Sequence, residues 1–490
     1  MKSTAPVIYF CLVTALACVQ IFMGANIFVI LSLYLISICG CFSLSIRDHR
    51  AGDILYFLFI LYYGTFALVI KTALLQPVDE NLDVPDLASV VILAGFMSIT
   101  VAYVVSRNIG FRFKFSREMS SYLSDDAILG KCVSIFFPIG IAFDTLHVFL
   151  RPVATQVAVD SGEGIGFFGT FYFITIFAVV CEASLAFSDR HGSRRGIARL
   201  GGMLLIIMFV SLAGNVKQSF IASISAAFVV FLMNKSRINI IREAVLGGAL
   251  TFILMFYVSP AIHITRGQAK ELPILERLDL AYEVMERASF DPFELQAQSE
   301  AVLAGYGASS DPRLNYFFPF MLNIDRLCLI HPINLVVSGS ETVGEMGFDA
   351  LNVWSSVLPS FLVTKSAAAS VDEIAWFYNF RARGIVARPV VGLVASSFAV
   401  GGGLGVLFLP GIAVLILFVI LNGLSGPLFG NPFGLFIGTS FLIIVEADLS
   451  GVFIYIFRNL LFIVAFAVVV KVALDAMGIA KPPQEGAQSQ

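Results

Sequence analysis

The chain has little charge and few histidines or tryptophans: charged residues make up 13% of its 490 positions, with five histidines and two tryptophans. A net charge of -3 excludes the strongly basic surface that binding to nucleic acid requires. The seven cysteines have neither the spacing of a metal site nor that of a disulfide framework. A Walker loop and a nucleophile elbow are also missing, which argues against the common classes of soluble enzyme.

Apolar residues are abundant instead: they make up 58% of the chain, and phenylalanine alone occurs 47 times. The mean hydropathy of +0.89 indicates that lipid surrounds much of the protein. We therefore predict an all-α, polytopic integral membrane bundle of about 12 transmembrane helices with one large periplasmic loop. The predicted spans are residues 5–23, 26–46, 53–74, 87–105, 132–150, 166–187, 199–214, 218–233, 243–264, 400–422, 431–447 and 451–474.

The charges between these spans predict their orientation, because short loops rich in lysine and arginine stay in the cytoplasm. With both termini in the cytoplasm, the external connections carry few cations, among them Lys71 and Lys217, and an acidic linker at residues 79–86. This pattern favours a multi-pass protein of the bacterial inner membrane. The cytoplasmic connections then carry Arg47, Arg50, Arg107, Arg112, Lys114, Arg117, Lys131, Arg190, Arg194, Arg195, Arg199, Lys235, Arg237 and Arg242.

One long polar stretch divides the chain. Residues 1–264 hold the first nine predicted spans, and residues 265–399 form the periplasmic loop, with short helices and a re-entry segment. Residues 400–475 hold the last three spans, and residues 476–490 form a disordered cytoplasmic tail. Within the loop, apolar residues at helical spacing over residues 275–304 predict a helix that lies on the membrane surface.

Isolated charges inside the predicted spans allow two interpretations. Asp144 and His147 lie three positions apart on one helical face, and Glu182 and Arg458 are single charges in apolar runs. They could form a pathway for protons or ions. We favour the other interpretation, in which Asp144 contacts His147, or Glu182 contacts Arg458, and the buried contact fixes the packing of the helices.

Cations recur where the polar loop meets the predicted bundle. Arginine suits a phosphate ligand, because its planar guanidinium stays charged at every physiological pH. Lys217, in the turn GNVKQS, would either bind an anionic phosphate or extend its ammonium to the lipid headgroups. For any one arginine, a structural salt bridge with an acid of the loop is the competing interpretation. The candidates are Lys217, Arg266, Arg326, Arg381, Arg383 and Arg388.

Over residues 200–425, the order of several short motifs resembles the Wzy-type O-antigen and exopolysaccharide repeat-unit polymerases. The stretch AGNVKQSFIASISAAFVV resembles the family's polar and basic turn before a helix, with Lys217 where an arginine is common. NIDRLCLIHPINLVV resembles the basic loop segment, and VLPSFLVTK, ending at Lys365, resembles the Leu-Pro-x-x-Leu element. RPVVGLVASSFAVGGGLGVLFLPGIAVL resembles the glycine-bearing re-entry helix.

This resemblance implies a metal-independent glycosyltransferase without a cofactor, which polymerises polyprenyl-diphosphate-linked oligosaccharides at the outer face of the inner membrane. Membrane lipid, a chain-length regulator and a flippase are its implied partners. The departing lipid diphosphate needs fixed cations, which Lys217, Arg266 and Arg326 would supply as catalytic residues. The base that activates the acceptor hydroxyl stays open between His331, Glu341 and Glu345. The implied substrate-binding residues are Arg381, Arg383, Arg388, Lys365 and His331.

Three other functions fit the same predicted topology. A transporter or flippase would also have about twelve spans, but we find no internal repeat of the kind that transporters carry. An O-antigen ligase-like enzyme would share the lipid-linked donor. A membrane scaffold would use the external loop only to bind partners.

The predicted orientation can be tested with single cysteines introduced at Ser193, Gly305 and Ser340. We expect an impermeant thiol reagent on intact cells to label positions 305 and 340, because both lie in the external loop, and to spare position 193. Labelling of position 193 with protection of the other two would reverse the orientation.

Overall fold

The computed structural model describes residues 4–150, 171–187, 194–213, 218–234, 253–265, 272–305, 314–317, 322–353, 357–358, 368–381, 383 and 389–476. Every regular element in these ranges is a helix. The elements are α1 (Ala5–Phe22), α2 (Ile27–Ser45), α3 (Ala51–Ile60), η1 (Leu61–Thr65), α4 (Phe66–Ala73), α5 (Pro85–Asn108), α6 (Lys114–Tyr122), α7 (Asp126–Leu150), α8 (Tyr172–Ala186), α9 (Arg194–Ala213), α10 (Gln218–Asn234), η3 (Leu254–Val258), α12 (Ser259–Thr265), α13 (Ile274–Arg287), α14 (Pro292–Gly305), α15 (Leu322–Asp325), α16 (Ile330–Val343), η5 (Phe348–Leu351), α18 (Ser370–Phe377), α19 (Leu393–Ser425), α20 (Pro432–Thr439), η6 (Leu442–Glu446), α21 (Leu449–Ile454), η7 (Tyr455–Asn459) and α22 (Leu460–Ala476).

The helices confirm the predicted class, an all-helical protein with the helices of a multi-pass membrane protein. The ninth predicted span, residues 243–264, lies partly outside the described residues. The total of twelve spans therefore stays a prediction. Eight described helices are long and apolar enough to cross a membrane, namely Ala5–Phe22, Ile27–Ser45, Ala51–Ala73, Pro85–Asn108, Asp126–Val148, Arg195–Ala213, Leu393–Ser425 and Leu449–Ala476, and three shorter apolar helices are Tyr172–Ala186, Ser219–Asn234 and Pro432–Glu446.

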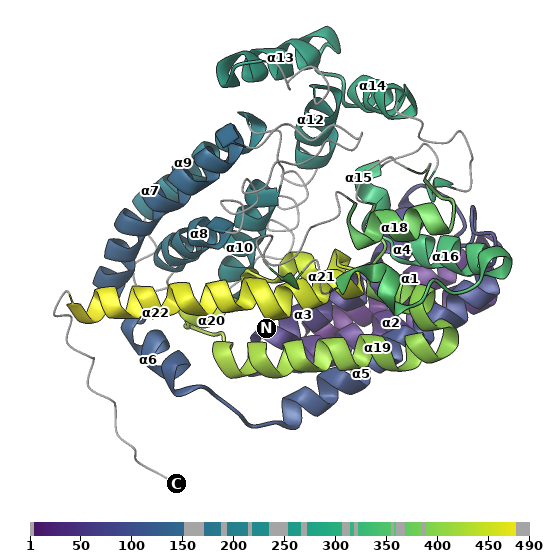
Figure 1. The fold of residues 1–490 in the computed structure, drawn as a ribbon, viewed down its shortest axis with the longest axis horizontal. Coiled ribbons are helices and arrows are strands. Elements are labelled where there is room, and N and C mark those ends of the chain that lie inside the picture. Colours follow the sequence, from purple (N-terminus) through teal and green to yellow (C-terminus); the bar gives the residue numbers. More distant parts are fainter. Residues whose placement is uncertain are drawn as a thin grey trace.

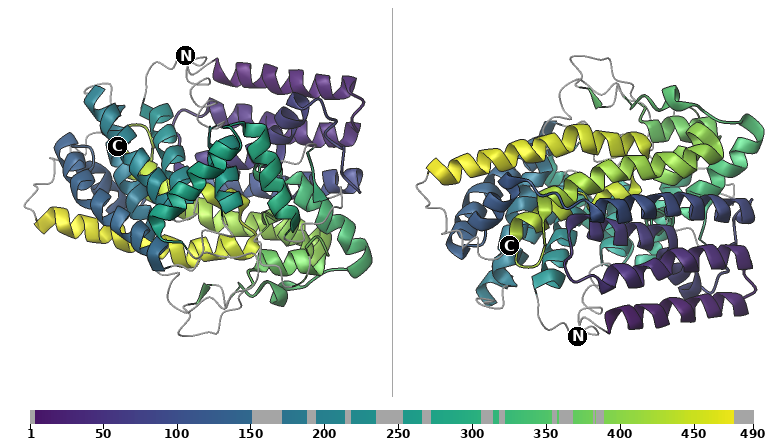
Figure 2. Two further views of the ribbon diagram at one scale, coloured as in Figure 1. Left: turned by 90° about the horizontal axis from the view of Figure 1, so that it is seen from above. Right: turned by 90° about the horizontal axis from the view of Figure 1, so that it is seen from below.

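The helices form two groups that α20 joins. In the first group, α19 packs along α5, α5 packs against α2, and α2 packs against α1, as the right-hand view of Figure 2 shows. In the second group, α8 lies among α7, α9 and α10. The short α20 contacts α3 in the first group and both α8 and α10 in the second. One apolar core therefore runs through both groups.

The close contact between α5 and α19 depends on glycine. A Cβ atom at Gly95 of α5 would lie 2.6 Å from the side chain of Val394 on α19. Farther along the same pair, the Ser98 hydroxyl donates to the carbonyl of Leu407 over 2.8 Å. Small residues let two backbones approach within a membrane, where hydrophobic burial between helices contributes little to association.

The helix α19 begins earlier than the predicted span at residue 400, and it is broken. Its backbone leaves the helical conformation at Gly401 and at Gly402, where φ is +52°. Only glycine adopts such a backbone readily. The Met346 amide and the Tyr378 hydroxyl both donate to the carbonyl of Ala399, at 2.7 and 3.2 Å, so the carbonyl before the break is satisfied.

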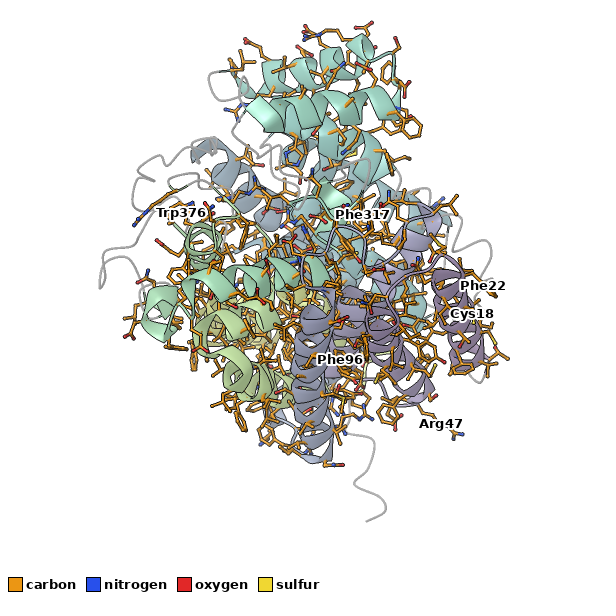
Figure 3. The ribbon with its side chains drawn as sticks, turned by 90° about the vertical axis from the view of Figure 1, so that its right-hand side faces the viewer. Cys18, Phe22, Arg47, Phe96, Phe317 and Trp376 are labelled. Carbon is orange, nitrogen blue, oxygen red and sulfur yellow. The ribbon has the colours of Figure 1, made fainter. Side chains whose placement is uncertain are left out.

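The predicted loop helix over residues 275–304 is instead a pair of helices, α13 and α14. The prediction of one continuous helix is wrong, because the backbone turns at Ser289 and Phe290, which have positive φ, and Pro292 starts the second helix. The pair packs on α12 around a small core of its own and projects from the bundle, at the top of Figures 1 and 3. We call residues 265–399 the insertion. Farther along it, α16 is buried against α5 and α19, so this part belongs to the bundle.

Asp144 and Glu182 do have partners, but different ones from those predicted. Asp144 accepts a hydrogen bond from Thr175 over 2.8 Å. Glu182 pairs with Arg199 of α9, so the predicted contact between Glu182 and Arg458 is wrong. The pairing fits the packing of α8 against α9, which the sequence did not reveal. Asp144 and Glu182 thus contact neighbouring helices, but in neither of the predicted pairs.

The two ends of the bundle differ in their polar contacts. We call the end that carries α16 and α18, at the right of Figure 1, the insertion end. At the opposite end, at the left of Figure 1, α6 lies near the end of α22. There Asp53 pairs with Arg107 at 2.5 Å and accepts a hydrogen bond from Tyr103 at 2.6 Å. The candidate site lies at the insertion end.

Candidate functional site

A lysine at the end of a membrane span is the starting point of the site. Lys71 lies in the last turn of α4, and its side chain is fully buried. Its ammonium donates to the carbonyl of Glu80 over 3.1 Å and to the side-chain oxygen of Gln76 over 3.4 Å. A buried ammonium without such acceptors would be costly. The linker that follows α4 therefore folds back over this lysine.

Two aromatic rings of the insertion, those of Tyr316 and Phe317, lie on the other side of Lys71. We use the name Lys71 cage for these rings together with the two oxygen atoms that accept from the ammonium. The ammonium lies 4.4 Å from the ring centroid of Tyr316 and 5.6 Å from that of Phe317. An aromatic face attracts a desolvated cation through its quadrupole. The Tyr316 hydroxyl in turn donates to the carbonyl of Val78 over 2.6 Å. Segment 314–317 is thus fixed to the first group of spans. Figure 3 looks onto this end and labels Phe317.

Tyr316 also holds His331, one of the predicted substrate-binding residues. The two rings stack with centroids 5.6 Å apart and planes 15° apart. The Nδ1 atom of His331 lies 3.3 Å from Oδ2 of Asp325, and the imidazole is only 4% exposed. If Nδ1 carries the proton, it donates to the carboxylate and fixes its orientation. Lys71, Tyr316, His331 and Asp325 therefore form one connected set.

A second ion pair lies beside this set and includes a predicted catalytic residue. Arg326 pairs with Glu446 at 3.1 Å, and the arginine side chain is 50% exposed. The same carboxylate accepts a hydrogen bond from Tyr62 over 3.2 Å. Arg326 follows α15 directly, so it leaves the buried set and reaches the surface. It is positioned to meet an anion from outside.

A third cation, Arg381, approaches the same carboxylate as His331. Burial lowers the pKa of the Arg381 guanidinium, and the nearby carboxylates of Asp325 and Asp372 raise it in part. Arginine remains protonated under these influences. Arg383, two positions later, is exposed. Of Arg381 and Arg383, only Arg381 therefore lies near Asp325.

The π-helix η1 explains how the insertion docks. A π-turn departs from the regular hydrogen-bond pattern of the helix, and such turns are frequent at functional sites. Here the carbonyl of Tyr62 accepts a hydrogen bond from the amide of Leu329 over 3.1 Å. The hydroxyl of Tyr63 accepts one from the amide of Val394 over 3.2 Å. These two bonds tie the segment before α16 and the start of α19 to one membrane helix.

One oxygen of the Asp325 carboxylate has a partner, and the other has none among the described residues. Its Oδ2 faces His331, whereas its Oδ1 is buried and finds no hydrogen-bond donor within the described part of the chain. A buried carboxylate oxygen without a donor is costly, and such groups are uncommon in folded proteins. Asp325 could therefore accept a proton, or a hydrogen bond from a hydroxyl, of a bound molecule. Arg326 and Arg381 could hold an anion nearby.

The structure brings together three of the eight predicted site residues: Arg326, His331 and Arg381. Sequence reasoning missed Lys71, Asp325 and Glu446 as members of the site. A weak signal existed, because Lys71 follows an apolar run and is followed by four acids within residues 79–86. Lys217, Arg266, Lys365 and Arg388 lie outside the described residues, so their predicted roles stay predictions.

Replacing Lys71 tests whether it holds the insertion in place. Lys71→Ala should remove the cation from the Tyr316 ring, at a cost of about 2 kcal/mol, and speed hydrogen exchange in residues 322–331 by about thirtyfold. Exchange in α5 should change little. Lys131→Ala, at an exposed lysine, is the matched control. Equal exchange in both variants would show that the cage does not hold this segment.

Comparison with known proteins finds no match of any of three kinds. No family model matches the chain, and neither the curated proteins nor the solved structures contain a match. The case for a function therefore depends on the residues at the insertion end.

Proposed function

We propose that this protein is a membrane glycosyltransferase that polymerises polyprenyl-diphosphate-linked oligosaccharide repeat units at the outer face of the bacterial inner membrane. The observation that carries the proposal is the Asp325 carboxylate, with one oxygen held by His331 and the other without a donor in the described chain. Arg326 follows Asp325 in the chain, and the Arg381 guanidinium lies within electrostatic reach of the same carboxylate. A base beside two guanidinium groups suits the attack of a hydroxyl on a lipid-diphosphate sugar.

The two arginines would bind the leaving group. As the bond between the sugar carbon and the diphosphate oxygen breaks, negative charge grows on the diphosphate. Arg326 is half exposed and can meet the headgroup, and Arg381 lies deeper. Guanidinium groups match phosphate oxygens in a planar, two-point fashion. Preorganised cations of this kind stabilise the developing charge more in the transition state than in the ground state.

Asp325 is our choice for the base. It would take the proton of the acceptor hydroxyl while the oxygen forms the new bond to the sugar carbon. Its side chain is 17% exposed, compared with 4% for His331, so the carboxylate is the less enclosed of the two groups. His331 then acts as a positioning residue. Glu341 and Glu345 are exposed and lie toward the far end of α16, and Glu345 approaches Gly402 at the break in α19.

The proposal includes an orientation in the membrane, two partner proteins and roles for the remaining cations. Twelve spans, a periplasmic insertion and cytoplasmic termini would put the site on the side where exported lipid-linked units arrive. A flippase would deliver these units, and a chain-length regulator would act on the product. The reaction would use neither a metal ion nor a nucleotide sugar. Lys217 and Arg266 would complete the cationic surface, and Lys365, Arg383 and Arg388 would contact the sugar chain.

One observation favours a transporter as the second candidate. The helix α19 is interrupted at Gly401 and Gly402, and interrupted helices line the substrate sites of many transporters. The exposed Glu345 carboxylate lies next to this interruption. A transporter would move the lipid-linked unit without joining two of them, so the products distinguish the candidates. A ligase-like enzyme would transfer the glycan to a different acceptor.

Turnover of a defined lipid-linked repeat unit by the purified protein tests the proposed function. Asp325→Asn should lower the rate by at least about a hundredfold, because the amide cannot take the proton. Arg326→Ala should lower it by about a hundredfold through lost charge stabilisation. Arg287→Ala is the control, since this exposed arginine lies on α13 and pairs only with Glu283 among the described contacts.

His331→Gln should have a smaller effect than Asp325→Asn, because it removes the support of the base and leaves the base itself. Folding should be checked by thermal unfolding of each variant. Wild-type turnover in folded Asp325→Asn, or the absence of any polymer with the wild-type protein, would contradict the proposal.

A further inference from the structure

The opposite end of the bundle contains a second group of cations. The connector between α5 and α6 packs there on the C-terminal end of α19. The amide of Phe113 donates to the carbonyl of Gly423 over 3.1 Å, and the Ser116 hydroxyl donates to the carbonyl of Leu424. The ring of Phe111 lies against Gly423, where a Cβ atom would come within 2.8 Å of it. This docking fixes the residue between the two phenylalanines, Arg112.

The Arg112 guanidinium lies flat against Gly426 at the end of α19, and its Nε atom lacks an acceptor among the described residues. A Cβ atom at Gly426, where φ is +60°, would lie 2.6 Å from Nε of Arg112 and 2.8 Å from Nη2. Nη2 donates to the Ser120 hydroxyl over a long 3.3 Å. The Nε atom is buried and has no hydrogen-bond acceptor within the described ranges. A buried guanidinium N–H of this kind costs free energy unless an acceptor arrives.

Two further arginines approach Arg112. Burial, together with the charges of Arg117 and Arg50, lowers the pKa of the Arg112 guanidinium. None of the three forms an ion pair with a carboxylate of the described residues. Nearby acids have other partners: Asp53 pairs with Arg107, Glu118 pairs with Lys471 at 2.5 Å, and Asp475 accepts a hydrogen bond from Tyr122.

Exposed apolar side chains lie in the same connector as Arg112 and in the last turns of α5, which precedes it. Ile109 is 40% exposed and Phe111 is 45% exposed, and both belong to the same connector as Arg112. Val104 and Val105, in the last turns of α5, are also exposed. Exposed apolar side chains beside a basic group match the edge of a bilayer, where acyl chains lie next to phosphates. A free anion in water would gain nothing from them.

We propose that Arg112, with Arg50 and Arg117, binds the phosphate of an anionic lipid headgroup at the opposite end of the bundle. The phosphate supplies the acceptor that Arg112 Nε lacks and neutralises part of the three positive charges. The acyl chains lie along the exposed face of α5. This site is separate from Asp325 and does not depend on the proposed glycosyltransferase activity. It would couple the docking of α6 on α19 to the lipid composition of the membrane.

The test uses the purified full-length protein in a neutral detergent and three probes: dioctanoyl phosphatidylglycerol, dioctanoyl phosphatidylcholine and sodium phosphate. The apparent Kd of each probe is read from the ligand-dependent rise in the thermal unfolding midpoint. Phosphatidylglycerol should stabilise the wild-type protein at concentrations where phosphatidylcholine does not. Arg112→Gln should weaken phosphatidylglycerol binding at least about tenfold.

Arg47→Gln, at an exposed arginine of a neighbouring loop, is the charge-matched control and should bind as the wild type does. If Arg112→Gln folds poorly, the double variant Arg50→Gln, Arg117→Gln should show the same loss. Equal stabilisation by sodium phosphate would overturn the lipid assignment in favour of a free-anion site. Undiminished phosphatidylglycerol binding in the variants, or equal losses in Arg47→Gln, would overturn the site itself.

Discussion

An ammonium group at the end of a membrane span must either reach water or find acceptors inside the protein. Lys71 does the second: its charge faces the carbonyl of Glu80 and the rings of Tyr316 and Phe317. Because the lysine belongs to a membrane helix and the rings belong to the insertion, the interaction joins two parts of the chain that are far apart in sequence. The stacked His331 and its neighbour Asp325 take their positions from this junction.

The need of each charge for water or for a polar partner also explains why polar groups gather at the two ends of the bundle. At the insertion end, Arg326 pairs with Glu446, and the preceding residue, Asp325, has a carboxylate oxygen without a donor among the described residues. At the opposite end, Asp53, Glu118 and Asp475 have partners, and the buried Nε–H of Arg112 has no acceptor among the described residues. Among the described residues, the buried atoms without a hydrogen-bond partner thus include a carboxylate oxygen at one end and a guanidinium nitrogen at the other. We interpret the unmatched carboxylate as a base and the unmatched guanidinium as an anion site.

The long apolar runs of the sequence predicted the helical membrane class and the approximate position of each described span, because a bilayer demands long apolar helices. Partners across helices were not predictable, since Glu182 meets Arg199 through the packing of α8 on α9. The division of residues 275–304 into two helices depends on the positive φ of Ser289 and Phe290, which the apolar spacing does not reveal, although Pro292 marks the start of the second helix. Arg326 and Arg381 were predicted as cations for a phosphate, and His331 as a candidate base and substrate-binding residue, whereas Lys71 and Asp325 emerged only from three-dimensional contacts.

The central claim is that Asp325 acts in joining lipid-linked units after their export. Its most direct test replaces the chromosomal copy with Asp325→Asn and locates the lipid-linked oligosaccharide with an externally added glycosidase. Our account predicts that polymer disappears while single repeat units accumulate on the outer leaflet, where the glycosidase cleaves them. Units trapped on the inner leaflet, or polymer of wild-type length, would contradict it.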